Sequence, residues 1–228
     1  MFPLSTSEPK NKIPLVTILV ILTNVLVFLY ELVTPNYDLF IMKYALIPGL
    51  LDSGNLSSLF PFISSMFLHG GFMHIISNMW FLWVFGGNVE ERLGHVVYLG
   101  FYLIAGIIAA FSQIIFDLGS MIPLLGASGA IAGVLGFYFV VSPGSRVKTL
   151  VIYYTRIGVY NVSAKYMLGL WALTQIFYSV GSIGADTGGV AWLAHIGGFL
   201  FGLFGGYIFN SRKRQLGEPV SVFSSRWA

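Results

Sequence analysis

Long uncharged apolar stretches recur along the whole chain, separated by polar, glycine-marked or proline-marked breaks. A helix needs about 20 apolar residues to cross ~30 Å of hydrocarbon, because each helical residue advances ~1.5 Å. Five stretches meet this length easily and a sixth is arguable. The pattern predicts an all-α polytopic membrane protein with six transmembrane helices, at residues 13–33, 69–88, 95–116, 125–142, 165–182 and 190–209.

The stretch 147–160 is apolar enough to suggest a further span, yet it contains Arg156 and is flanked by Arg146, Lys148 and Lys165. A spanning helix would hold the Arg156 guanidinium near hydrocarbon, which costs ~2.5–3.5 kcal/mol on insertion scales. We therefore expect this stretch to stay on one side of the membrane.

The first apolar stretch, 13–33, follows Lys10 and Lys12 and so resembles a signal peptide. It is longer than the apolar core of a signal peptide, and no A-x-A cleavage site follows it. We therefore expect it to be a retained membrane helix.

The positive charges predict the orientation of these spans. With six spans, Lys43 is alone on one side of the membrane and the other 11 of the 12 Lys and Arg residues share the opposite side. Because cytoplasmic segments are enriched in Lys and Arg, both termini are predicted to be cytoplasmic, and the loops near 34–68, 117–124 and 183–189 external. The predicted organisation is an N-terminal tail, one membrane domain and a C-terminal tail, at 1–12, 13–210 and 211–228.

The composition supports a chain whose main solvent is lipid. Only 9% of its residues are charged and 56% are hydrophobic, whereas soluble domains carry about 25% charged residues. The net charge of +3 is small and scattered, which argues against nucleic-acid binding. The chain has no cysteine, so disulfides, thiol catalysis and cysteine-bound metals are excluded, and four histidines remain as scarce reactive groups.

Four polar side chains inside the predicted spans fall at a similar depth. Ser128 opens the fourth span and His195 lies about five residues into the sixth, so each is on the order of 5–10 Å below the external boundary. His74 and Asn78 lie slightly deeper in the second span. Each alone has a simple structural explanation, such as a hydrogen bond within or between helices. Their common depth instead favours one shared site.

Glycines predict a close approach of the fourth and sixth spans. Apolar side chains of ordinary size hold helix axes ~8–10 Å apart, and glycine removes this spacing. On a helical wheel, three glycines share a face with His195 and three others form a strip beside Ser128. They are Gly198, Gly202 and Gly206 in the sixth span, and Gly129, Gly133 and Gly136 in the fourth.

Other hydrolytic chemistries lack the residues that they need. His69 and His74 are five residues apart, so on a helix they point ~140° away from each other, and no acidic ligand is near. The chain has no H-E-x-x-H motif, and no Asp falls within a confident span to build an aspartyl pair. We therefore predict no metal and no cofactor, which leaves serine chemistry as the remaining hydrolytic option.

Three motifs together resemble those of a known family. They are H-x4-H-x3-N at His69, His74 and Asn78, G-A-S-G at 126–129, and A-H-I-G-G at 194–198. In this order and spacing, from about Leu15 to Asn210, the chain resembles a bacterial rhomboid intramembrane serine protease. The three motifs are specific as a set, whereas G-x-S-G alone would not be.

This resemblance implies a six-helix enzyme that hydrolyses peptide bonds in or near transmembrane segments of other proteins through an acyl-enzyme. It implies that Ser128 is the nucleophile and His195 the base. His74, Asn78 and the Ser128 backbone N–H match the oxyanion site of the family. The implied partners are transmembrane proteins, expected to be single-span, and the lipid bilayer, and the implied location is the bacterial plasma membrane.

Supporting roles follow for other residues. His69 matches the first histidine of the family and is expected to support a loop. Glu90 and Arg92 are expected to tie the turn between the second and third spans. Close packing around the site is expected from the glycines Gly126, Gly129, Gly198 and Gly202.

Two positions depart from the family pattern. Phe60-Pro61 replaces a frequent Trp-Arg pair of the first external loop, and Ala132 replaces an aromatic residue often found four positions after the serine. Neither change removes a nucleophile, base or proton donor, so we expect an altered rate or stability. Asp186, nine residues before His195 in an external loop, is not expected to complete a triad.

Two alternative functions are consistent with a polytopic membrane chain. An inactive rhomboid-like protein that binds or escorts membrane clients would share the fold, but it should lack the nucleophile or the base, and Ser128 and His195 are both present. A small transporter would more naturally show paired halves with broken helices, and the sequence shows none.

Overall fold

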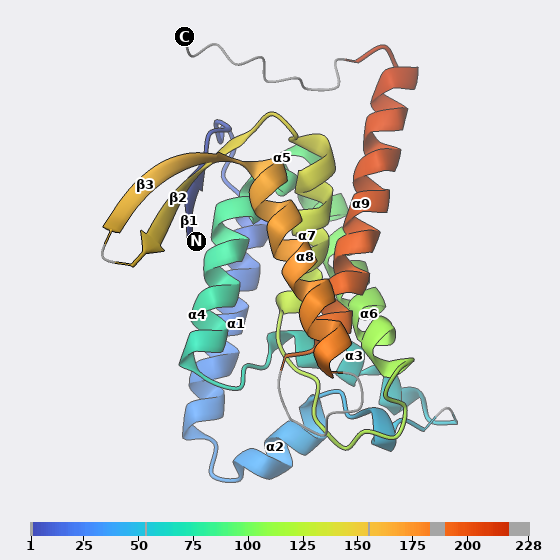
Figure 1. The fold of residues 1–228 in the computed structure, drawn as a ribbon. Helices are drawn as coiled ribbons and strands as arrows, with labels where there is room; N and C mark the ends of the chain where they lie inside the picture. The colour runs from blue at the N-terminus through green and yellow to red at the C-terminus, as the bar shows by residue number, and fades with distance from the viewer. Residues whose placement is uncertain (1, 53, 155, 183–189, 219–228) are drawn as a thin grey trace.

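The computed structural model describes residues 2–52, 54–154, 156–182 and 190–218. Its long helices run side by side, and a small sheet lies at one end of them (Figure 1). The main helices are α1 (Leu15–Val33), α2 (Tyr37–Tyr44), α4 (Phe72–Phe81), α6 (His95–Ile114), α7 (Ser128–Val141), α8 (Ala164–Ser182) and α9 (Trp192–Gln215). Shorter helices are η1 (Pro48–Leu50), η2 (Leu56–Leu59), α3 (Pro61–Ser64), η3 (Ser65–Phe67) and α5 (Gly87–Leu93), the last joined to α4 by a π-helical segment, η4 (Leu82–Gly86).

Each of the six predicted apolar stretches contains a helix, namely α1, α4, α6, α7, α8 and α9. Within the described residues, α1, α6 and α9 are each long and apolar enough to cross a membrane. The number rises to four if residues 56–67 and 72–93, bent by 84° at a short break, form one span. Helix α7 is apolar but has only 14 residues. The chain is therefore mostly helical and membrane-embedded, and the count of six spans stays a prediction.

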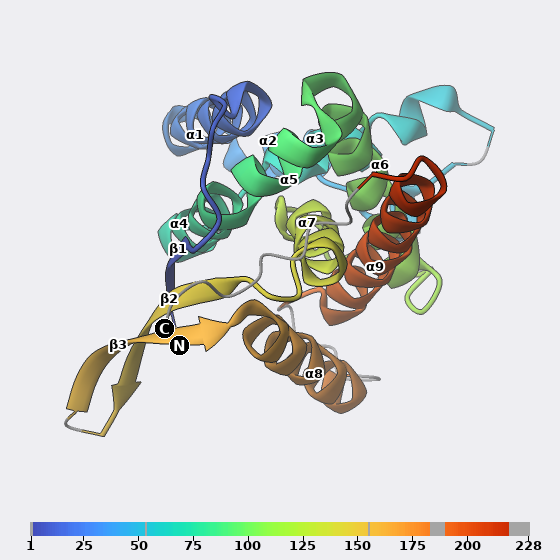
Figure 2. The ribbon, with the colours of Figure 1, turned by 90° about the horizontal axis from the view of Figure 1, so that it is seen from above.

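Helix α7 is the centre of the bundle. Every residue from Gly129 to Tyr138 is buried, as expected for a helix that is apolar on all sides. Seen from above, α4, α5, α6, α8 and α9 surround it (Figure 2). In Figure 1 the chain rises from the lower loop to reach the first residue of α7 among the other helices. The start of α7, and Ser128 with it, is thereby enclosed by the bundle.

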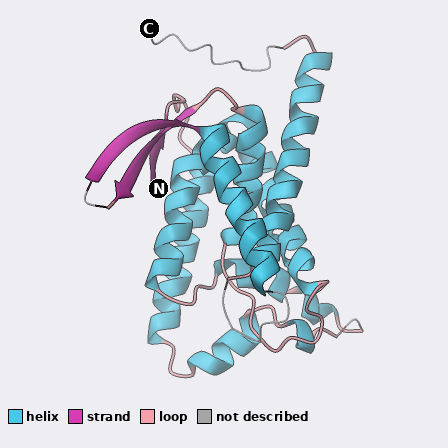
Figure 3. Cartoon of the chain, in the orientation of Figure 1, coloured by secondary structure: helices cyan, strands magenta, loops and turns pink. Residues whose placement is uncertain are grey.

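A three-stranded antiparallel sheet corrects the prediction of an all-α fold (Figure 3). Its order is β1-β2-β3, with strands β1 (Phe2–Thr6), β2 (Arg146–Tyr153) and β3 (Arg156–Ser163). Strands β2 and β3 pair along their whole length, from Arg146 opposite Ser163 to Tyr153 opposite Arg156. The sheet therefore occupies the segment between α7 and α8 together with the first residues of the chain.

The segment 147–160 forms strands because its side chains alternate between two environments. Val147 and Thr149 are buried, whereas Arg146 and Lys148 are exposed. This two-residue period is typical of a half-buried strand and not of a helix. The prediction that the segment is not a seventh spanning helix agrees with the structure, although the strands themselves were not predicted.

The segment predicted as an N-terminal tail is held against the bundle. Besides the pairing of β1 with β2, the Trp80 indole donates to the carbonyl of Pro3, and the Thr6 hydroxyl donates to Asn88 Oδ1 at 3.0 Å. Glu8 is buried and forms an ion pair with Arg92, at 3.0 Å. The first residues of the chain thus contribute to the packing at the end of α4 and in α5.

Glu90 has a larger role than the predicted turn. Its carboxylate accepts hydrogen bonds from the backbone N–H of Val16 and of Thr17, both at 2.8 Å, and from the Thr17 hydroxyl at 2.6 Å. The first backbone N–H groups of a helix have no partner within it, so Glu90 caps the start of α1. His95 contacts the same carboxylate at 2.5 Å. Glu90 therefore joins α1 to α5 and α6.

Candidate active site

A cavity of about 760 Å³ lies between α4, α7, α8 and α9. Most of its lining is apolar, and no carboxylate, Lys or Arg is among the described residues that line it. A sizeable apolar cavity with a few convergent polar groups is the usual form of a binding or catalytic site. Its polar side chains are Tyr37, His74, Ser77, Asn78, Ser128, Gln175 and His195.

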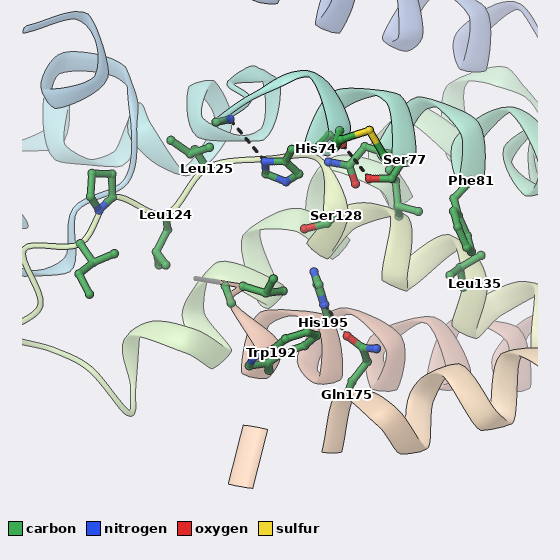
Figure 4. Close-up of a pocket in the computed structure, with 18 of the residues that line it drawn as sticks. His74, Ser77, Phe81, Leu124, Leu125, Ser128, Leu135, Gln175, Trp192 and His195 are labelled. Atoms are coloured by element: carbon green, nitrogen blue, oxygen red, sulfur yellow. Dashed lines mark hydrogen bonds between the residues drawn. The ribbon is translucent and has the colours of Figure 1, made fainter. Parts of the chain in front are cut away.

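Ser128 and His195 meet in this cavity, although 67 positions separate them in the chain. Ser128 is the first residue of α7 and is half-buried, whereas His195 belongs to the first turn of α9 and is 8% exposed. Figure 4 shows Ser128 and the His195 ring next to each other in this cavity. The common depth expected from the sequence is therefore accompanied by lateral closeness.

His74 and Asn78 face the same cavity from adjacent turns of α4. The Gly70 backbone N–H donates to His74 Nδ1 at 3.4 Å, so a neutral ring carries its proton on Nε2 and can donate there. Asn78 is buried, and its Nδ2 has no hydrogen-bond partner among the described residues. A buried unpaired donor costs ~1–3 kcal/mol, so its presence beside Ser128 calls for a function.

His69 supports His74 from the segment that precedes α4. It is 1% exposed, and its ring lies edge-on to the His74 ring with 5.1 Å between centroids. Its backbone N–H donates to the buried carboxylate of Glu31 on α1, at 3.2 Å. His69 therefore lies behind His74 and does not line the cavity itself.

Gly126 allows the chain before α7 to pass close to His74. Its φ of 118° lies in the region that side chains rarely adopt. A Cβ at this position would come within 2.6 Å of His74 Nε2. Glycine is thus required both by the backbone conformation and by the narrow space between His74 and the start of α7.

The predicted close approach of α7 and α9 is confirmed. A Cβ on Gly198 would collide with the carbonyl oxygen of Gly129, and one on Gly202 would collide with that of Gly133. The backbones of the two helices are therefore in contact along this strip. This contact brings the first turns of α7 and α9, with Ser128 and His195, to one place.

We expect Gly202→Ala to lower the free energy of unfolding by about 2–3 kcal/mol, because the added methyl group forces α7 and α9 apart. Thermal unfolding of the purified protein in detergent measures this loss. Gly100→Ala on α6 is the matched control, since nothing lies within 4 Å of the added Cβ. At position 100 alanine should leave the free energy of unfolding unchanged or raise it, because alanine is a better helix former than glycine by ~1 kcal/mol. Equal losses in the two variants would contradict the role of the contact.

Comparison with protein-family models matches residues 56–212 to the Rhomboid domain. The match covers well over half of the chain and contains all the cavity-lining polar groups on α4, α7, α8 and α9. The chain belongs to the rhomboid family.

Several curated proteins are similar to this rhomboid. "Rhomboid protein 1, mitochondrial" of Saccharomyces cerevisiae is 29% identical over 212 residues, which cover 90% of this chain and 56% of that protein. "Presenilin-associated rhomboid-like protein A, mitochondrial" of Danio rerio is 29% identical, over 72% of this chain and 41% of that protein. "RHOMBOID-like protein 5" of Arabidopsis thaliana is 29% identical, over 67% and 44% respectively.

This rhomboid spans about half the length of these relatives. All three are eukaryotic, and two of them carry the word mitochondrial in their names. They support a membrane-embedded member of the family. They give no support to the bacterial plasma membrane that the sequence analysis predicted.

Aromatic side chains lie near both of the places where this rhomboid departs from the family pattern. Ala132 is buried in α7, and the rings near His195 are those of Trp171 on α8 and Trp192 on α9, each with its centroid 6.0 Å away. Phe60 packs against Tyr44, with ring centroids 6.2 Å apart. His195 therefore has aromatic neighbours from positions other than 132, and in the first loop Phe60 itself makes an aromatic contact.

Gln175 and Trp171 line the cavity from α8, and neither was predicted from the sequence as a site residue. Gln175 is 5% exposed, and its Oε1 lies 2.8 Å from His195 Nδ1. Gln175 could have been found from the sequence, because it is a polar side chain within the predicted span 165–182. The same criterion had selected Asn78 in the second span. Asp186, the acid that was not expected to join a triad, lies outside the described residues.

Proposed function

We propose that this rhomboid is an intramembrane serine endopeptidase that cleaves peptide bonds in or near transmembrane segments of other membrane proteins. The family includes serine proteases. The observation that carries the proposal is the meeting of Ser128 and His195, from two different helices, in one cavity (Figure 4).

In the proposed reaction, His195 Nε2 accepts the Ser128 proton as Oγ attacks the carbonyl carbon of the scissile bond. The tetrahedral intermediate collapses when the imidazolium gives this proton to the leaving amine, which departs and leaves an acyl-enzyme. Water then gives a proton to His195 and attacks the ester. Release of the carboxylic acid returns the proton to Ser128 Oγ.

The negative charge of the tetrahedral intermediate needs donors that are already in place. Asn78 Nδ2, His74 Nε2 and the Ser128 backbone N–H are the three candidates, as the family resemblance implies. The unpaired state of the buried Asn78 Nδ2 supports this assignment. The start of α7 adds the positive end of a helix dipole at the same place. A preformed donor of this kind is typically worth ~2.7–4 kcal/mol in the transition state.

The substrate class follows from the lining of the cavity. No carboxylate, Lys or Arg is among the described residues that line it, and its apolar lining includes Met73, Ile131, Leu135 and Trp171. Such a lining suits the uncharged side chains of a membrane segment and disfavours a charged peptide. We propose single-span membrane proteins as substrates, bound from within the bilayer.

The test uses the full-length protein, reconstituted into liposomes with a labelled single-span substrate. A fluorophosphonate, which reacts with activated serine hydroxyls, should label the protein and block cleavage in parallel. Mass spectrometry of the labelled protein should place the adduct on Ser128. Cleavage that continues at full rate after complete labelling, or an adduct on another residue alone, would contradict the proposal.

A further inference from the structure

The imidazole of His195 has a second neighbour besides Ser128. Gln175 projects from α8 into the cavity, and its Oε1 lies 2.8 Å from His195 Nδ1. Both side chains are more than nine-tenths buried. In Figure 4 the ring of His195 lies between Ser128 on one side and Gln175 on the other.

The orientation of the Gln175 amide is determined by its own helix. Gln175 Nε2 lies 3.1 Å from the carbonyl oxygen of Trp171 and 3.0 Å from Thr174 Oγ1. A carbonyl oxygen can only accept, so the amide must direct its NH₂ group to Trp171. The Thr174 hydroxyl donates to the same carbonyl at 2.6 Å and is left as an acceptor for the amide. The Gln175 oxygen therefore faces His195.

This amide orientation selects one tautomer of the histidine. An amide oxygen can only accept, so the proton of a neutral His195 must lie on Nδ1 and be donated to Gln175 Oε1. The lone pair then lies on Nε2, at the edge of the ring that faces Ser128. A general base needs an unprotonated nitrogen within reach of the hydroxyl, and this tautomer supplies it.

Among the described residues around His195, no charged side chain could replace Gln175 as the acceptor for Nδ1. His74 and Tyr37 line the same cavity, and Tyr178 stacks on the neighbouring Trp192 with centroids 4.9 Å apart. No carboxylate, Lys or Arg among the described residues lines the cavity from α2, α4, α7, α8 or α9. Gln175 is thus the group that bonds Nδ1 in the part of the chain that the structure describes.

We propose that Gln175 is a positioning residue, which holds His195 in the tautomer and orientation that the base requires. The inference rests on the proposed protease function and adds to it a neutral third member beside Ser128 and His195. An amide oxygen orients the ring as a carboxylate would, but it carries no charge to stabilise the imidazolium. Gln175 on α8 therefore orients the His195 ring without adding a charge to the site.

The test compares Gln175→Leu and Gln175→Glu with wild type, and uses Leu173→Ala as the control on the same helix, where the side chain is 63% exposed. Gln175→Leu should lower kcat by roughly five- to tenfold with little change in KM, which is the effect of one lost neutral hydrogen bond. Leu173→Ala should match wild type. Thermal unfolding reports the stability of each variant.

The pH profile separates positioning from packing. Gln175→Glu keeps an oxygen acceptor for Nδ1, so it should retain more activity than Gln175→Leu at high pH. Its carboxylate also favours the protonated imidazole, and the base must be unprotonated, so the acid limb of kcat/KM should move to higher pH. Wild-type kcat and an unchanged pH profile in Gln175→Leu would overturn the inference.

A measurement on the wild-type protein covers the case in which the variants fail to fold. The ¹⁵N chemical shifts of histidine-labelled protein should identify His195 as the tautomer protonated on Nδ1, and finding the proton on Nε2 would overturn the inference. Failure of the protease proposal is distinguishable, since it would appear as wild-type protein that neither cleaves substrate nor reacts with the fluorophosphonate.

Discussion

Replacing Ser128 by alanine, His195 by alanine, or both together should lower kcat for substrate cleavage by about 10⁴- to 10⁶-fold in all three variants. Nucleophile and base act as a unit, because the attack of one requires proton transfer to the other. Once either residue has been replaced, replacing the other should lower kcat little further. Single-turnover cleavage in liposomes measures the three rates, with the double variant as the decisive sample.

Ser77→Ala is the matched control for this comparison. Ser77 lines the same cavity, but its hydroxyl donates to the carbonyl of His74 in its own helix, at 3.0 Å. Its loss should leave kcat within about twofold of wild type, because that helix carbonyl keeps its backbone partner. Rate losses in Ser128→Ala and His195→Ala that multiply in the double variant would mean that the two residues act separately, against the proposed mechanism.

Asn78→Ala should lower kcat by about 10²- to 10³-fold while KM stays nearly unchanged. The Asn78 amide is buried and unpaired in the described structure, so it is free to bond an oxygen that becomes negative only during the reaction. A donor used in this way stabilises the transition state and not the bound substrate, and its removal acts on kcat. Steady-state kinetics in detergent separates the two constants.

Asn24→Ala provides a second buried membrane asparagine for comparison. Asn24 lies on α1, where its Nδ2 donates to the Val20 carbonyl at 2.7 Å, and it does not line the cavity. Its replacement should affect stability alone. If Asn78→Ala reduces the amount of folded protein as much as it reduces turnover, Asn78 is a packing residue and the oxyanion assignment is wrong.

The sequence correctly predicted where the helices lie, because that information is local. The stretches that became α1, α6 and α9 are visible as apolar runs of sufficient length, and Ser128 and His195 each lie in the first turn of a helix, near where the sequence had placed them. The glycine strips were equally readable, since a helical wheel needs only residue spacing. The contact of Gly198 with Gly129 follows that reading.

The sheet was missed for a physical reason. A segment such as 147–160 shows an alternation of two environments, but strands are stable only when they find partners, and β1 is supplied by Phe2–Thr6 from the other end of the chain. Hydropathy over a window of 20 residues averages that alternation away. The cap that Glu90 provides to α1 is also a contact between distant segments, and it was predicted only as a local turn.

The amino-acid sequence by itself determined the apolar helices, the positions of the polar groups along them and the family motifs, since each depends on the spacing of residues along one segment. Only the tertiary structure decided which polar groups share a cavity. It brought Ser128 and His195 together, placed Gln175 against Nδ1 of that ring and put Trp171 and Trp192 beside it. The packing angles of helices set these contacts, and those angles depend on side chains from several segments at once.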